Sequence, residues 1–139
     1  MVKYVIAYIV TLVVFLAADA VWLGTMATRL YKPTLGDILL PEFVVAPAAI
    51  FYALFIIGIL IFAVTPAFAS GHWSTALLYG ALFGFFSYGV YDLTNMSTLR
   101  NWTLLITLLD LCWGTFLTGL AATLGFVITD ALAKAFKLG

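Results

Sequence analysis

The chain has 139 residues, of which 65% are hydrophobic and only 9% charged, and its formal net charge is zero. The mean hydropathy of +1.19 lies far above that of soluble domains. These values exclude a water-soluble globular protein, because no soluble core buries so much apolar surface. They predict one membrane-embedded domain over residues 1–139.

Four apolar stretches are each long enough to cross a hydrocarbon layer of about 30 Å. They cover residues 4–24, 44–64, 74–95 and 103–129. Their interiors lack the polar–apolar alternation of membrane β-strands, and a backbone in lipid must satisfy its own hydrogen bonds. The sequence therefore predicts an all-α integral membrane protein, with four transmembrane helices in an antiparallel bundle.

The first stretch carries an acidic residue, Asp19, near its end. Its apolar run is longer than the core of a usual signal peptide, so we expect a membrane span. Polar and aromatic residues recur around the acid at steps of three and four, which places them on one face of a helix. This stripe consists of Tyr8, Thr11, Phe15, Asp19 and Trp22.

The connection after the first stretch, residues 25–43, mixes apolar and charged side chains. Its charged residues are Arg29, Lys32, Asp37 and Glu42. We expect Pro33 and Pro41 to interrupt any continuous helix there. The pattern predicts an amphipathic segment at the membrane interface, lying over the aspartates as a lid, and the alternative is an ordinary interfacial connector.

The second stretch is almost wholly apolar apart from Tyr52, and we expect it to supply walls rather than chemistry. The third stretch brings a second acid, Asp92, with three polar residues on adjoining positions: Tyr88, Tyr91 and Asn95. The fourth carries another polar stripe, formed by Thr103, Thr107, Asp110, Gly114 and Thr118. Small residues in the last two stretches predict close approach of their backbones.

The three intramembrane acids, Asp19, Asp92 and Asp110, are the main functional clue, because a carboxylate in hydrocarbon is costly. Four crossings place Asp19 and Asp92 near the far ends of their helices. Asp110 then lies about 11 Å into the fourth helix, at 1.5 Å per residue. We therefore predict that all three occupy the same depth and meet in one buried pocket.

A structural role for the acids is the competing hypothesis. Arg29, Lys32 and Arg100 are predicted on the same side of the membrane, so each acid has a cation available for an ion pair between helices. In the functional hypothesis, acids sharing a buried pocket form a proton donor or a cation site. The residues alone leave both hypotheses open.

Several other chemistries are excluded or disfavoured. The single cysteine, Cys112, rules out an internal disulfide and a CxxC pair, and His72 lies in the loop at the opposite face. No nucleophile elbow and no phosphate-binding glycine loop is present. Tyr91-Asp92 matches half of an intramembrane aspartyl protease motif, but Leu108-Leu109 precede Asp110 where glycine is needed. No metal site is predicted, and the cofactor is unassigned.

A local motif occurs twice: Asp19 and Asp110 are each followed three positions later by a tryptophan, Trp22 or Trp113, with a glycine just beyond. The third stretch ends in Tyr91-Asp92-x-Thr94-Asn95, and Trp102 follows. In this combination the whole chain resembles the bacterial membrane proteins of domain of unknown function 2177. The resemblance implies a compact helical inner-membrane protein with these polar positions as its signature, and it implies no activity.

Two classes of function stay open, and a third is weaker. The first is a small protein that binds, carries or modifies a lipid-like or amphiphilic molecule in a pocket between helices. Its candidate residues are Asp19, Trp22, Tyr88, Tyr91, Asp92, Asn95, Arg100, Asp110 and Trp113. The second is a non-catalytic scaffold or complex subunit whose acids hold helices together. The third is proton or cation transport, although no helix interior shows a glycine or proline break. Whether the protein is an enzyme is left open.

The expected surroundings are the lipid bilayer of the bacterial inner membrane, with a lipid-like ligand and no nucleic-acid partner. Small-residue helix faces also suggest a homo-oligomer. Lysine and arginine are evenly split between the two sides: Lys3, Lys134 and Lys137 against Arg29, Lys32 and Arg100. Because the loop side has more acids, we favour termini in the cytoplasm.

Overall fold

Long apolar helices make up most of residues 1–138, which the computed structural model describes. The elements are α1 (Val2–Met26), η1 (Ala27–Tyr31), α2 (Lys32–Leu35), α3 (Val45–Ile59), η2 (Leu60–Val64), α4 (Thr65–Ser70), α5 (Trp73–Thr98) and α6 (Leu104–Ala135). They combine into four helices long and apolar enough to cross a membrane: Val2–Leu35, Val45–Ser70, Trp73–Thr98 and Leu104–Ala135. The predicted all-α fold with four spans is confirmed.

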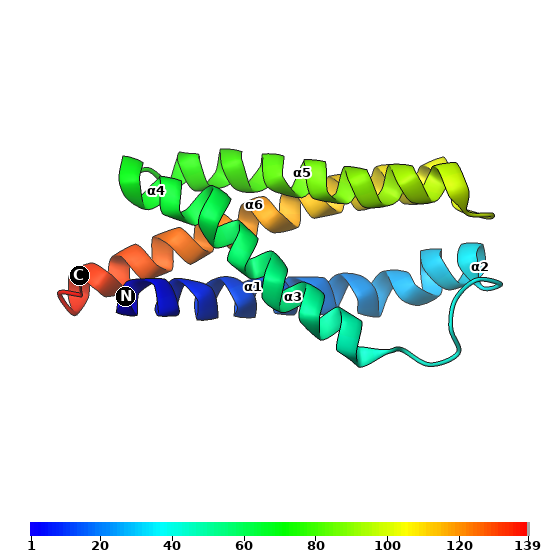
Figure 1. The fold of residues 1–139 in the computed structure, drawn as a ribbon, viewed down its shortest axis with the longest axis horizontal. Helices are drawn as coiled ribbons and strands as arrows, with labels where there is room; N and C mark the ends of the chain where they lie inside the picture. Colours follow the sequence, from blue (N-terminus) through cyan, green and yellow to red (C-terminus); the bar gives the residue numbers. More distant parts are fainter. Residues whose placement is uncertain (139) are drawn as a thin grey trace.

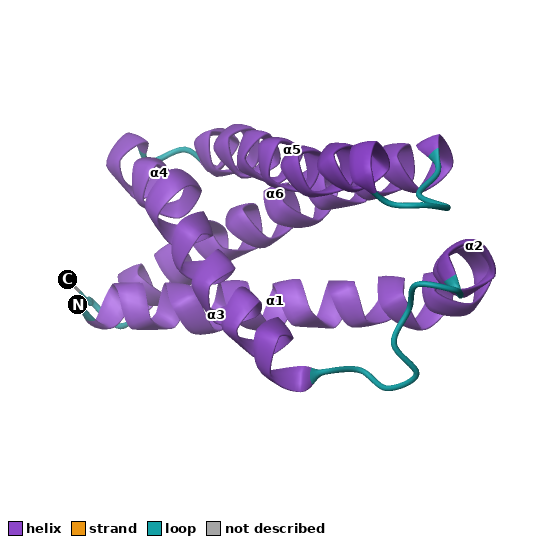
Figure 2. Cartoon of the chain, turned by 45° about the vertical axis from the view of Figure 1, so that its right-hand side comes forward, coloured by secondary structure: helices purple, strands orange, loops and turns teal. Residues whose placement is uncertain are grey.

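The first helix is longer than predicted, because α1, η1 and α2 form one continuous helix from Val2 to Leu35. Pro33 lies in the first turn of α2 and does not interrupt it, so that expectation was wrong. The irregular part of the connection is confined to residues 36–44, drawn as a teal loop in Figure 2. Its location at a membrane interface stays a prediction.

The two π-helical turns, η1 and η2, each precede a proline by two residues. Pro33 has no N–H for the carbonyl of Arg29, and Pro66 has none for that of Phe62, and both carbonyls belong to the π turns. A proline ring also clashes with the carbonyl four residues earlier. The wider π turn accommodates this clash, which explains why both helices continue past their prolines.

Figure 1 shows how the chain runs. The N- and C-termini lie at the same end of the molecule, α1 and α5 lead away from that end, and α6 returns to it. The second helix crosses obliquely, with α3 in front of α1 and α4 beside the start of α5. This helix ends at Gly71, whose φ of 75° gives the left-handed conformation that commonly terminates helices.

Close packing between α5 and α6 depends on glycine. A Cβ atom added at Gly80 would lie 2.7 Å from the Cβ of Ala122, and one at Gly84 would lie 2.3 Å from the carbonyl oxygen of Gly114. No larger side chain fits at these positions without moving the helices apart. The small residues predicted to allow backbone approach therefore do so within one chain.

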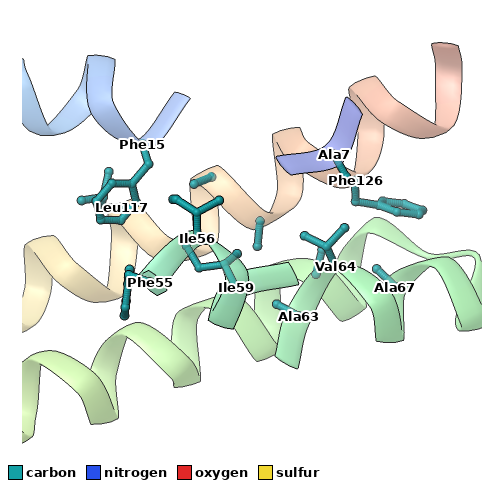
Figure 3. Packing of buried hydrophobic residues seen from close by; sticks show 13 residues of the cluster. Ala7, Phe15, Phe55, Ile56, Ile59, Ala63, Val64, Ala67, Leu117 and Phe126 are labelled. Atoms are coloured by element: carbon teal, nitrogen blue, oxygen red, sulfur yellow. The ribbon is translucent and has the colours of Figure 1, made fainter. Parts of the chain in front are cut away.

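An apolar core fills the half of the bundle that is nearer the termini (Figure 3). It includes Phe15 of α1, Ile56 and Ile59 of α3, and Leu117 and Phe126 of α6. Large apolar side chains also cover the outside of all four long helices, as expected of surfaces that face lipid. One helical turn beyond Phe15 along α1, the core gives way to the acidic residues.

Candidate functional site

Three aspartates from three helices are buried in the half of the bundle away from the termini. Asp19 of α1 is 8% exposed, Asp92 of α5 is fully buried, and Asp110 of α6 is 7% exposed. The stripes predicted to face inward do so in α1 and α6. Their buried members are Thr11, Phe15 and Asp19 in α1, and Thr107, Asp110, Gly114 and Thr118 in α6.

The Asp19 carboxylate joins α1 to two other helices. It accepts hydrogen bonds from the hydroxyl of Tyr52 in α3, at 2.5 Å, and from Nε1 of Trp113 in α6, at 3.3 Å. Tyr52 belongs to the helix expected to supply walls, and its hydroxyl adds a polar contact to a buried acid. In the sequence, Tyr52 stands out because it is the one residue of α3 that carries a hydroxyl group.

The Asp110 carboxylate is held by the end of the first helix. The hydroxyl of Tyr31 donates to Oδ1 of Asp110 and accepts a hydrogen bond of 3.1 Å from Nε1 of Trp22. Tyr31 lies in η1, and its neighbours Leu30 and Leu35 pack on Ile106 of α6. Residues 27–35 thus cover the start of α6. No sequence pattern had indicated Tyr31 as a partner of Asp110.

The two motif tryptophans stack on each other. The rings of Trp22 and Trp113 lie with centroids 4.6 Å apart and planes 7° from parallel. Each indole serves the acid of the other motif, because Trp113 donates directly to Asp19 while Trp22 reaches Asp110 through the Tyr31 hydroxyl. The repeated spacing therefore corresponds to a reciprocal contact between the first helix and α6.

Asp92 differs from the other two acids because neither of its carboxylate oxygens receives a hydrogen bond. Its position faces Asp110, because Gly84 of α5 lies at Thr118 and Tyr88 lies at Gly114, so the next turn of the two antiparallel helices pairs Asp92 with Asp110. Tyr88 lies one helical turn before Asp92 on α5, and Gly114 lies one turn after Asp110 on α6. The Tyr88 ring occupies the space left by Gly114, where an added Cβ would be only 2.2 Å from the ring.

The structure thus brings two of the three acids together and connects the third through aromatic side chains. No three acids, histidines or cysteines in residues 1–138 are grouped closely enough to hold a metal ion. That all three carboxyl groups share one buried pocket stays a prediction. Tyrosine and tryptophan side chains contact two of them, since Tyr52 and Trp113 donate to Asp19 and Tyr31 donates to Asp110.

Ion pairing does not explain the buried acids. Over the part of the chain that the structure describes, one ion pair is formed, between Lys134 and Asp130 at 2.7 Å near the end of α6. The three cations proposed as partners, Arg29, Lys32 and Arg100, are exposed. The prediction that each acid is matched by a cation was therefore wrong.

The remaining predicted residues lie at the edge of the cluster. Tyr91 is 56% exposed and packs edge-on against Trp102, with ring centroids 5.6 Å apart. Asn95 is half-buried and Arg100 exposed. Tyr91 and Asn95 lie in α5 with Asp92, and Arg100 follows the end of that helix. None of the three bonds to a buried acid in the described chain.

Two apolar grooves mark the outside of the bundle. One, of about 340 Å³, lies between α1 and α3 and is lined by Tyr8, Leu12, Leu16, Phe43, Val45, Ala48, Ala49, Tyr52 and Ala53. The other, of about 590 Å³, lies along α5 and α6 and includes Cys112, which is exposed rather than packed inside. Only the first groove shares a residue, Tyr52, with the acidic cluster.

Comparison with known proteins gives one match. A family described as "Predicted membrane protein (DUF2177)" matches residues 4–127, which include all three buried acids and both stacked tryptophans. No curated protein and no solved structure matches the chain.

Proposed function

The chain belongs to the DUF2177 family of predicted membrane proteins, and we propose that it binds an amphiphilic molecule by holding the polar end at its buried acids. The apolar part of this molecule would lie in the groove between α1 and α3. Binding is the step that carriage or modification of such a molecule would require. The chemistry of the bound molecule would determine any reaction at this site.

One observation carries this proposal: Tyr52 belongs both to the groove and to the acidic cluster. Its ring lines the groove, and its hydroxyl donates to the buried carboxylate of Asp19. A molecule seated in the groove would therefore meet a polar group at the inner end of an otherwise apolar wall. Apolar walls with a few convergent polar groups are typical of ligand sites.

The length of the groove suits an extended apolar chain. Leu12 lies two turns and Leu16 one turn before Asp19 on α1, so the groove leads along the helix toward the acid. Its volume of about 340 Å³ falls at the lower end of the range typical of small-molecule sites. The groove opens to the side of the bundle, which supports entry from the lipid.

A structural role is the second candidate, and a specific observation favours it. Every hydrogen bond to Asp19 and Asp110 comes from a different element: Tyr52 of α3, Trp113 of α6 and Tyr31 of η1. Such bonds hold helices together whether or not a ligand binds. Asp92 accepts no hydrogen bond and does not fit this role.

Asp92 therefore separates the two candidates experimentally. Wild-type protein, Asp92→Asn and the control Asp130→Asn would be purified in mild detergent, and bound molecules identified by native mass spectrometry beside a thermal unfolding curve. We expect an amphiphile on the wild type and the control and its loss from Asp92→Asn, with equal melting temperatures once all three proteins are delipidated, because a bound ligand itself raises the melting temperature. An unchanged ligand content in Asp92→Asn, or no bound amphiphile on the wild type, would overturn the proposal. A lower melting temperature with no ligand would support the structural role.

We also propose that the protein resides in the bacterial inner membrane with both termini in the cytoplasm. The charge balance of the sequence supports this orientation, since the loop side carries Asp37 and Glu42 beside its cations. In a Cys112→Ser background, a cysteine at position 37 should react with an impermeant maleimide in intact spheroplasts. A cysteine at position 3 should react only after lysis, and the reverse pattern would reverse the orientation.

A further inference from the structure

We infer that the polar end of the bound amphiphile is a protonated amine. This inference rests on the proposed function and specifies the class of ligand. It follows from the charge, the unused hydrogen-bonding capacity and the aromatic surroundings of the acidic cluster.

The first argument is charge. Asp19, Asp92 and Asp110 are buried, and along residues 1–138 none of them forms an ion pair with a lysine or arginine. Buried carboxylates without a cation are costly, since the loss of hydration is not repaid by a partner. A positively charged group on the ligand would supply the cation that the protein chain does not place there.

The second argument is the unused capacity of Asp92. The side chain is fully buried and both carboxylate oxygens lack a donor, while the register of α5 against α6 places Asp110 opposite it. A primary ammonium group has three N–H donors and no acceptor. It is therefore matched to a site that offers several oxygen acceptors and no free donor.

The donors already present argue against an anionic headgroup. The hydroxyls of Tyr31 and Tyr52 and the indole of Trp113 all point at Asp19 or Asp110. A phosphate or carboxylate ligand would have to displace these bonds and would then face the acids as a like charge. The same contacts therefore disfavour the binding of anionic amphiphiles.

The third argument is the aromatic lining. The Tyr88 ring packs on Gly114, one turn from Asp110, and the Trp22–Trp113 stack lies between α1 and α6. Aromatic faces attract cations, most strongly where water is excluded. An ammonium group at Asp92 would therefore have both carboxylates and aromatic rings within reach.

The test uses four probes on delipidated full-length protein in detergent: dodecylamine, dodecanol, dodecanoate and magnesium chloride alone. Binding is measured by thermal shift on this protein, and by displacement of the co-purified amphiphile from protein that has not been delipidated. We expect dodecylamine to bind roughly tenfold more tightly than dodecanol, and dodecanoate and magnesium to give no shift. Asp92→Asn should lose the preference for the amine, and the control Asp130→Asn should keep it.

The outcomes distinguish this inference from the proposed function. Equal binding of amine and alcohol, or preference for dodecanoate, would overturn the amine and keep an amphiphile site. A shift by magnesium alone would replace the amine with an inorganic cation. Binding of no probe would overturn both proposals. If Asp92→Asn does not fold, the ranking of headgroups on the wild-type protein decides by itself.

Discussion

Trp22 and Trp113 lie face to face, with ring centroids 4.6 Å apart, and each indole donates toward the acid of the other's motif. This exchange ties the far end of α1 to α6 and fixes the positions of two carboxylates at once. A tryptophan in a membrane protein is commonly an interfacial anchor. Here the pair forms part of the polar interior.

The stacking predicts energetic coupling between the two indoles. Replacing both Trp22 and Trp113 by leucine should cost less than the sum of the single replacements, with a coupling of about 0.5–1.5 kcal/mol. SDS-titrated unfolding of the two single variants and the double variant measures this coupling. Combining Trp22→Leu with Trp73→Leu, an exposed tryptophan outside the stack, should give additive costs. If the costs for the stacked pair are additive, the contact between the two rings does not contribute to stability.

Tyr31→Phe should loosen the end of the first helix. The substitution removes the one hydroxyl that joins Trp22 to Asp110, and a hydrogen bond to a charged group contributes about 1.5–3 kcal/mol. We expect a lower melting temperature and faster amide exchange over residues 27–35. Tyr79→Phe, at an exposed position of α5, is the matched control. Unchanged exchange in Tyr31→Phe would mean that packing alone holds this segment.

Gly114→Ala should displace the Tyr88 ring. The added Cβ would lie 2.2 Å from that ring, and such overpacking costs about 1–3 kcal/mol. Gly24→Ala is the control, because no atom lies within 4 Å of its added Cβ and removing a glycine from a helix gains about 0.5–1 kcal/mol. Thermal unfolding should therefore move in opposite directions for the two variants. A Gly114→Ala protein as stable as wild type would contradict the observed packing of the Tyr88 ring on Gly114.

Tyr52→Phe tests the connection between groove and acid. The ring stays in the groove, but Asp19 loses a hydroxyl donor, at a cost of about 1–3 kcal/mol for a buried group. We expect the co-purifying amphiphile to decline, as quantified by mass spectrometry. Tyr8→Phe removes a different hydroxyl from the same groove, one that bonds the carbonyl of Ala53 at 3.2 Å. Equal ligand loss in both variants would indicate a general defect of the groove.

The spans and the inward stripes were predictable because they depend on composition and helical period alone. Asp19 and Asp110 fall on the buried faces of α1 and α6, as their three- and four-residue spacing to threonine and phenylalanine indicated. Such patterns report which side of a helix is polar. They do not report how far one helix is rotated against another.

The partners of the acids were not predictable for that reason. Tyr52 and Tyr31 reach Asp19 and Asp110 from elements far away in sequence. Tyr52 stands out as the one hydroxyl-bearing residue of α3, but no local pattern indicates which acid either tyrosine contacts. The predicted topology placed Arg29, Lys32 and Arg100 on the same side of the membrane as the acids and so suggested ion pairs, but the side chains of these cations are exposed. Pro33 suggested a helix end, whereas a π turn carries the helix past it.

That π turn has a mechanical consequence. A π turn holds a surplus residue, so returning it to α-helical geometry would shift the phase of the adjoining backbone by about 100°, the rotation of one residue. Tyr31 is the last residue of the turn and carries the hydroxyl that contacts Asp110. The winding of five backbone residues, rather than a side-chain rotation, therefore decides whether Asp110 keeps that hydroxyl.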